Sequence, residues 1–153
     1  MQKIIIFLSI GLLILTFAPQ AQGDFSLGGR VQNLSIFGFN GPEKSFWMAG
    51  PNVDFGLSEQ VRFRASFLYG TEGEEDAFHT GGKIIFDFAP GGVNPYLGAG
   101  GGGFFIQEEE NAFLPELLMG TEIEIGDSWT IYGELIHTFL FVSRTGVGIS
   151  FSF

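Results

Sequence analysis

The sequence predicts an all-β fold, an eight-stranded antiparallel up-and-down transmembrane β-barrel. From Asp24 onward the chain divides into eight segments in which apolar and polar residues alternate, which is the period of a β-strand. The chain contains 19 Phe and 24 Gly, yet no long apolar run follows residue 17. Dispersed apolar residues of this kind indicate strands that face lipid, because a membrane-spanning helix needs a continuous apolar run.

The N-terminus has the layout of a secretory signal peptide. Lys3 supplies a positive charge, residues 4–17 are apolar, and Ala21 and Gly23 are small residues before a cut at Asp24. The alternative is an uncleaved anchor, but the apolar run is shorter than the roughly 20 residues that a spanning helix needs. We therefore expect residues 1–23 to be a cleaved signal peptide and residues 24–153 to form one barrel domain.

Eight strands are expected after the signal peptide. They cover about residues 25–37, 45–57, 60–69, 77–88, 95–107, 112–125, 129–141 and 144–153. Leu34 and Ile36 continue the polar face of the first strand, which predicts a β-bulge near Asn33. Pro51 predicts a bulge or a local bend in the second strand. An even number of strands returns both termini to one side of a barrel, and each strand is long enough to cross a membrane.

Charged residues within the strands share the non-apolar face, where they would line the lumen as a charge network. They are Arg30, Asp54, Arg62, Arg64, Lys83, Asp87, Glu116, Glu122, Glu124, Glu134 and Arg144. Five positive and six negative charges nearly cancel, as expected where charges must pair to offset the cost of desolvation. Since eight strands leave an interior that side chains fill, we expect a polar plug in preference to an open path.

Aromatic residues and acidic loops give the predicted barrel two distinct ends. Near the termini lie Phe25, Phe55, Phe63, Phe88, Tyr96, Trp129 and Phe153, and near the opposite end lie Phe37, Trp47, Tyr69, Phe78, Phe104, Phe139 and Phe141. Two such belts are typical of the two membrane interfaces. The longer, acidic connections 38–44, 70–76 and 107–111 lie at the opposite end, which predicts that this end faces outward.

The last strand carries a family resemblance. Residues 144–153 alternate strictly and finish on Phe-Ser-Phe, and the segment resembles the closing strand of bacterial outer-membrane β-barrels. The segment Pro95-Tyr-Leu-Gly-Ala-Gly100 is also similar to a fifth-strand segment of the small OmpA/OmpX-like family, and the likeness covers essentially the whole mature chain. It implies a Gram-negative outer membrane, with lipids and lipopolysaccharide around a monomeric barrel. It also implies that Phe151 and Phe153 are the signal read by the barrel assembly machinery.

No catalytic, cofactor or metal site is expected. Gly98–Gly103 matches G-x-G-x-x-G only formally, because no helix pattern follows it. His137 invites comparison with outer-membrane lipid A deacylases, which carry a lipid-facing His and Ser two residues apart, but the matching position here is Phe139. Two His and no Cys make a transition-metal site unexpected. For the acidic loops, a repulsive surface is favoured over a site for divalent cations.

The composition limits the function further. Without Lys3 the chain carries six Lys and Arg against 17 Asp and Glu, a formal charge of −11, which disfavours nucleic-acid binding. We expect a non-catalytic outer-membrane protein with a structural or surface-interaction role, and no peptidoglycan-binding domain after Phe153. The alternatives are a narrow porin-like channel for small solutes or ions, a lipid-modifying enzyme, and a soluble exported barrel that buries its Phe and Val around a ligand.

Overall fold

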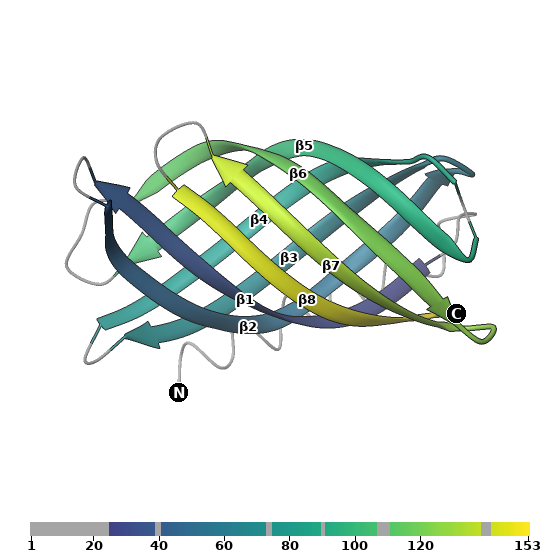
Figure 1. Cartoon of the computed structure of the whole chain (residues 1–153), viewed down its shortest axis with the longest axis horizontal. Helices are drawn as coiled ribbons and strands as arrows, with labels where there is room; N and C mark the ends of the chain where they lie inside the picture. Colours follow the sequence, from purple (N-terminus) through teal and green to yellow (C-terminus); the bar gives the residue numbers. More distant parts are fainter. Residues whose placement is uncertain (1–24, 39–40, 73–74, 90, 107–110, 139–141) are drawn as a thin grey trace.

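A computed structural model describes residues 25–38, 41–72, 75–89, 91–106, 111–138 and 142–153. In this part of the chain eight strands pair antiparallel with their sequence neighbours, and the last pairs with the first to close a barrel (Figure 1). They are β1 (Phe25–Gly38), β2 (Gly41–Ser58), β3 (Val61–Glu72), β4 (Glu75–Asp87), β5 (Val93–Ile106), β6 (Ala112–Ile125), β7 (Trp129–Thr138) and β8 (Val142–Ser152). The predicted fold class is confirmed. The described residues include no helix of the length and apolarity that crossing a membrane requires.

Both described ends of the chain lie at one end of the barrel, where the backbone N–H of Phe153 donates to the carbonyl of Phe25 at 3.1 Å. We call this the terminal end and the opposite one the far end. The strands at the far end are longer than the sequence suggests: β3 and β4 continue to the pair Glu72–Glu75, inside the expected loop 70–76. The backbone ladder therefore extends beyond the apolar pattern that defines the strands in the sequence.

The predicted bulge near Asn33 is wrong. β1 and β2 remain in register from Phe25–Phe55 to Ile36–Lys44, and the register shifts only between Ile36 and Phe37. The side chain of Leu34 points into the lumen and is fully buried, because the far part of the lumen is itself apolar.

The residues that alternate with Leu34 are polar and face outward. The Asn33 amide donates to Ser45 Oγ at 2.9 Å, and Ser35 Oγ donates to Asn33 Oδ1 at 2.8 Å. At the far end of β1 the inner face is therefore apolar and the outer face polar, although the alternation of side chains along the strand is unbroken. No bulge occurs at Pro51 either, since Pro51 pairs in register with Gly29; the shift in the β2–β3 ladder falls between Gly56 and Ser58.

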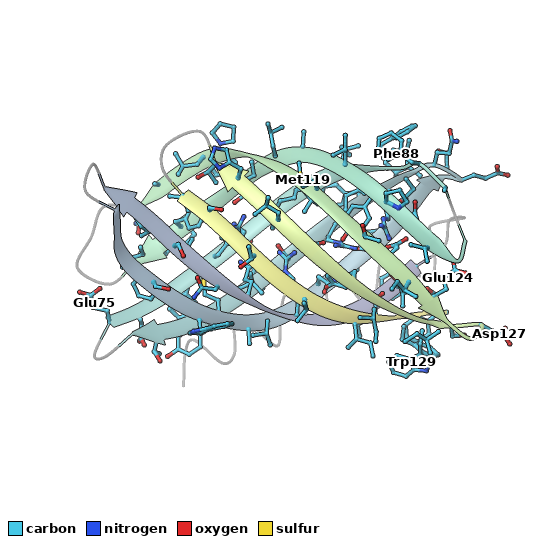
Figure 2. The ribbon with its side chains drawn as sticks, viewed as in Figure 1. Glu75, Phe88, Met119, Glu124, Asp127 and Trp129 are labelled. Atoms are coloured by element: carbon cyan, nitrogen blue, oxygen red, sulfur yellow. The ribbon has the colours of Figure 1, made fainter. Side chains whose placement is uncertain are left out.

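Apart from the far end of β1 and β2, the outer surface of the barrel is mostly apolar. Large side chains exposed there include Leu27, Val31, Ile84, Leu97, Leu117, Met119, Ile131, Val147 and Ile149. Phe88 and Trp129 point away from the ribbon in Figure 2, while Glu75 and Asp127 mark the far end and the terminal end. This is the reverse of a soluble barrel, which buries its apolar face and exposes its charges.

Candidate functional site: the barrel lumen

Alternation along each strand directs most of the charged side chains of the strands into the lumen. Eight of the predicted lumen residues are buried: Arg30, Asp54, Arg64, Lys83, Asp87, Glu116, Glu134 and Arg144. Arg62 and Glu122 are half-buried. Glu124 differs from the prediction, because it lies near the end of β6, where solvent reaches its side chain. Its carboxylate is exposed and accepts a hydrogen bond from the backbone N–H of Gly92 at 3.1 Å.

One set of ion pairs, the terminal-side cluster, comprises Arg30, Asp54, Arg62, Arg64, Asp87, Glu122 and Glu134. Arg64 donates from Nε and Nη2 to the two oxygens of Asp54, each at 2.6 Å, and from Nη1 to Glu134. Arg30 Nη1 donates to the other oxygen of Glu134 at 2.8 Å. Strands β1, β2, β3 and β7 are thereby tied together through the interior.

Arg62 extends the terminal-side cluster toward the barrel mouth. Its Nη2 donates to Asp87 at 2.9 Å and to Glu122 at 2.6 Å, and its Nη1 lies 3.5 Å from Asp54. Asn94 donates to the same two carboxylates, to Asp87 at 2.8 Å and to Glu122 at 2.9 Å. Each carboxylate therefore has at least two donors, which offsets the cost of removing it from water.

Two buried tyrosines pack against these guanidinium groups. Tyr96 donates to Glu134 at 3.0 Å, and Tyr132 donates to Asn52 at 2.6 Å. The Arg64 guanidinium carbon lies 4.6 Å from the Tyr132 ring centroid, a cation–π distance. The prediction that Tyr96 belongs to an aromatic belt is wrong. Tyr96 shares parity with the buried Asn94, opposite the exposed Val93 and Leu97, and so falls on the inner face of β5.

A second set, the Glu116 cluster, surrounds one carboxylate with three basic side chains. Lys83 Nζ lies 2.5 Å from Glu116, His79 Nε2 lies 2.9 Å from it, and Arg144 also contacts it. All four side chains are almost completely buried. If His79 is counted as neutral, this cluster is positive by one charge and the terminal-side cluster negative by one. The ten charged groups of the two clusters therefore cancel.

The far part of the lumen is filled by an apolar cluster that the sequence analysis missed. This far-end cluster comprises the buried residues Leu34, Phe46, Met48, Leu68, Ala77, Phe104 and Val142, with Ile36, Ile106 and Leu114 packed against it. The signal was present in Leu34, Ile36 and Leu68, which sit on the polar parity of their strands. Phe104, predicted in the far belt, instead lies inside this cluster, with its ring 4.8 Å from that of His79.

Aromatic rings form a girdle around the terminal end. Phe25 lies 5.4 Å from Phe55 and 5.6 Å from Phe153, and Phe151 lies 5.0 Å from Trp129. At the far end Trp47, Tyr69 and Phe105 are exposed. Phe139, Phe141 and the side chain of Phe37 lie outside what the structure describes.

No protein-family profile and no curated protein sequence matches this chain. Among solved structures, the N-terminal β-barrel domain of Pseudomonas aeruginosa OprF is similar, with 16% identity and a TM-score of 0.64 over 86% of this chain and 100% of that one. Neisserial surface protein A is similar at 13% identity and a TM-score of 0.64, over 84% and 97% of the two chains. The outer membrane enzyme PagL has 10% identity and a TM-score of 0.52, over 82% and 98%.

The chain has the fold of the small outer-membrane β-barrels. At these identities the likeness concerns the fold, the OmpA/OmpX-like eight-stranded architecture. PagL is named an enzyme. The fold therefore does not decide whether this chain catalyses a reaction, and that has to be judged from its own residues.

His137 is the one predicted candidate for chemistry on the outer face. It lies opposite Ser143 across β7 and β8, beside a groove lined by Leu97, Leu117 and Met119. The comparison with lipid A deacylases points to position 139 of the same strand, and strand pairing, which the sequence does not encode, brings Ser143 opposite His137 instead. No hydrogen bond joins His137 to Ser143, and the described outer faces of β6, β7 and β8 carry no acidic side chain to orient the imidazole. Among the described residues no three His, Asp or Glu side chains are placed to hold a metal ion.

Proposed function

We propose that this protein is an integral β-barrel of a bacterial outer membrane, with a closed lumen, a structural or surface-interaction role and no catalytic activity. The far-end cluster carries the proposal. Its buried Phe46, Met48 and Phe104 fill the lumen at one end, and the ion pairs of the other two clusters fill the rest. A continuous aqueous path would have to pass through tightly packed apolar side chains, which exclude water.

The apolar outer face supports the proposed location. Val31, Met119 and Val147 would be costly to expose to water and suit contact with acyl chains. In the proposed location, outer-membrane lipids and lipopolysaccharide surround the barrel. We take the barrel to be monomeric. Membrane fractionation tests the location. The protein should remain with the outer membrane after alkaline washing and should migrate faster on gels when unheated; recovery in the soluble fraction would contradict the proposal.

Conductance in planar bilayers separates the closed barrel from its rival, a narrow pore. The unaltered protein should produce no channel events. The double variant Phe46→Ala/Phe104→Ala removes both aromatic rings of the far-end cluster. It should produce small, brief events, which would show that the assay detects an opened lumen. Steady conductance by the unaltered protein would favour the pore.

The proposed absence of catalysis is best tested at His137 and Ser143, which lie opposite each other on the outer face. Overexpression of the unaltered protein should leave the mass spectrum of lipid A and of the phospholipids unchanged. Loss of an acyl chain that is reversed by Ser143→Ala, but not by the neighbouring outward substitution Thr145→Ala, would identify a lipid hydrolase instead.

A further inference from the structure

One wall of the lumen presents an unusual set of hydrogen-bond donors. Arg30 and Gln32 of β1 face inward, and so does Arg144 of β8, which pairs with Leu34, the next inward residue of β1. Arg30, Gln32 and Arg144 are at most 4% exposed. The two β8 residues opposite Arg30 and Gln32 are the glycines Gly148 and Gly146. The Tyr132 ring covers Gly148 and the Gln32 side chain covers Gly146, so Gln32 is the inward side chain of this wall between the two arginines.

Much of the donor capacity of these side chains is unused within the protein. Arg30 bonds to Glu134 through Nη1 alone, and Arg144 bonds to Glu116 through Nη2 alone. Arg30 Nε and Nη2, Arg144 Nε and Nη1, and Gln32 Nε2 have no hydrogen-bond partner among the described residues. Buried donors are nearly always paired in folded proteins, because an unmet one keeps its full desolvation cost. These five N–H-bearing nitrogens are therefore available to an acceptor that is not a side chain of the described residues.

The local charge indicates which acceptor fits. Glu116 is the one carboxylate of its cluster, and it faces both Lys83 and Arg144. Arg30, although paired with Glu134, lies near enough to repel both of them. Glu134 attracts Arg144 as well, but Arg30 and Arg64 already share that carboxylate, so the free N–H groups on this wall face no carboxylate of their own. Water would accept hydrogen bonds here but would leave the repulsion among the positive side chains in place. An anion would accept the hydrogen bonds and also reduce that repulsion.

We propose that the lumen binds one small monovalent anion, of halide size, beside Gln32 and between the guanidinium groups of Arg30 and Arg144. The anion accepts from the free N–H groups and screens Arg30 from Arg144. It is a structural ion that joins the Glu116 cluster to the terminal-side cluster, and it requires no open path through the far-end cluster.

Bromide is the direct probe, because it replaces a halide and scatters X-rays anomalously. Crystals of the full-length mature barrel, grown with bromide in place of chloride, should show an anomalous peak within hydrogen-bond distance of Arg30, Gln32 and Arg144. The thermal midpoint should also rise saturably with bromide at constant ionic strength. Density without anomalous signal at this position would mean that water fills it, and the proposal would be overturned.

An amide-to-acid pair of variants tests the same point in solution. Gln32→Glu places a carboxylate at the proposed anion position, so it should fold at least as stably as the unaltered chain and should lose its response to bromide. Asn94→Asp is the matched control. That amide donates to Asp87 and Glu122, so an added carboxylate there is repelled and should lower the midpoint. Equal destabilisation by both variants, or a bromide response retained by Gln32→Glu, contradicts the proposal.

A third variant covers the case in which Gln32→Glu does not fold. Gln32→Leu removes one neutral donor and adds no charge, so it should weaken bromide binding by about fivefold and leave the anomalous peak in place at high bromide. Unchanged bromide affinity in Gln32→Leu would show that Gln32 does not contact the anion and would overturn the proposed position.

Discussion

Arg64 and Asp54 face each other directly across β3 and β2 and are joined by two parallel hydrogen bonds of 2.6 Å. The remaining Nη1 of Arg64 reaches Glu134 on the other side of the lumen. Arg64 therefore holds carboxylates from two walls at once, and its side chain is only 1% exposed. Replacing it leaves two buried carboxylates without their main partner. We expect Arg64→Met to lower the free energy of unfolding by about 3–5 kcal/mol, measured by urea denaturation in lipid vesicles.

A double-mutant cycle isolates the pair. Asp54→Asn alone should also destabilise the barrel, and the double variant should cost less than the two single changes together, by about 1–3 kcal/mol. Arg62→Met is the control, because Arg62 lies nearer solvent and its removal should cost less. Strict additivity of Arg64→Met and Asp54→Asn would mean that their contact contributes nothing.

The sequence predicts which side chains enter the lumen but not how they pair. Arg62 and Arg64 alternate with Val61, Phe63 and Ala65, and that alternation alone assigns the two arginines to the inner face. The contact between Arg64 and Glu134 joins residues 70 positions apart. It depends on the tilt and stagger of the strands in the closed barrel, which alternation does not encode.

Two features escaped prediction for different physical reasons. The sequence predictions assume that inward-facing side chains are polar. Leu34 and Leu68 face inward and are apolar, because the far end of the lumen is filled by apolar side chains. Tyr96 was assigned by its aromatic ring, whereas alternation with Val93 and Leu97 puts it on the same face as the polar Asn94. In all three cases the parity along the strand gives the correct direction of the side chain, and the residue type gives the wrong one.

Glycine at position 100 lets two strands approach closely. A Cβ added there would lie 2.0 Å from the carbonyl oxygen of Gly82 on the neighbouring strand, a distance that backbone atoms cannot relieve cheaply. Gly100→Ala should therefore destabilise the barrel by about 1–3 kcal/mol. Gly29→Ala, where nothing lies within 4 Å of the added atom, should change stability little in the same urea titration. Similar effects of the two variants would argue that the close approach at Gly100 is unimportant.

The middle of the outer face should not tolerate charge. Val147 is 64% exposed at the centre of β8 and would contact acyl chains in the proposed orientation. Val147→Lys should cost about 2–4 kcal/mol in vesicles. Leu57→Lys, next to the end of β2, should cost at most about 1 kcal/mol, because its ammonium group reaches the interface. If Val147→Lys were as harmless as Leu57→Lys, the face would lie in water.

The terminal phenylalanine offers a test of assembly as distinct from stability. Phe153 is 76% exposed and touches Phe25 and Phe151 in the girdle. If the barrel assembly machinery reads the end of β8, Phe153→Ala should reduce the amount of heat-modifiable barrel in cells several-fold. Trp129→Ala removes another girdle ring but leaves the chain end intact, and should reduce it less. An equal loss in both variants would assign the effect to the girdle.

The central claim is that apolar side chains on the outer face contact lipid while the lumen is closed to it. Leu117 and Leu118 are adjacent in β6, with side chains on opposite faces, 49% and 2% exposed. Nuclear Overhauser effects to the acyl chains of a nanodisc, measured on labelled methyl groups, compare the two directly. We predict strong cross-peaks from the Leu117 methyls to lipid methylene protons and none from those of Leu118. Lipid contact by Leu118, or water contact by Leu117, would contradict the account.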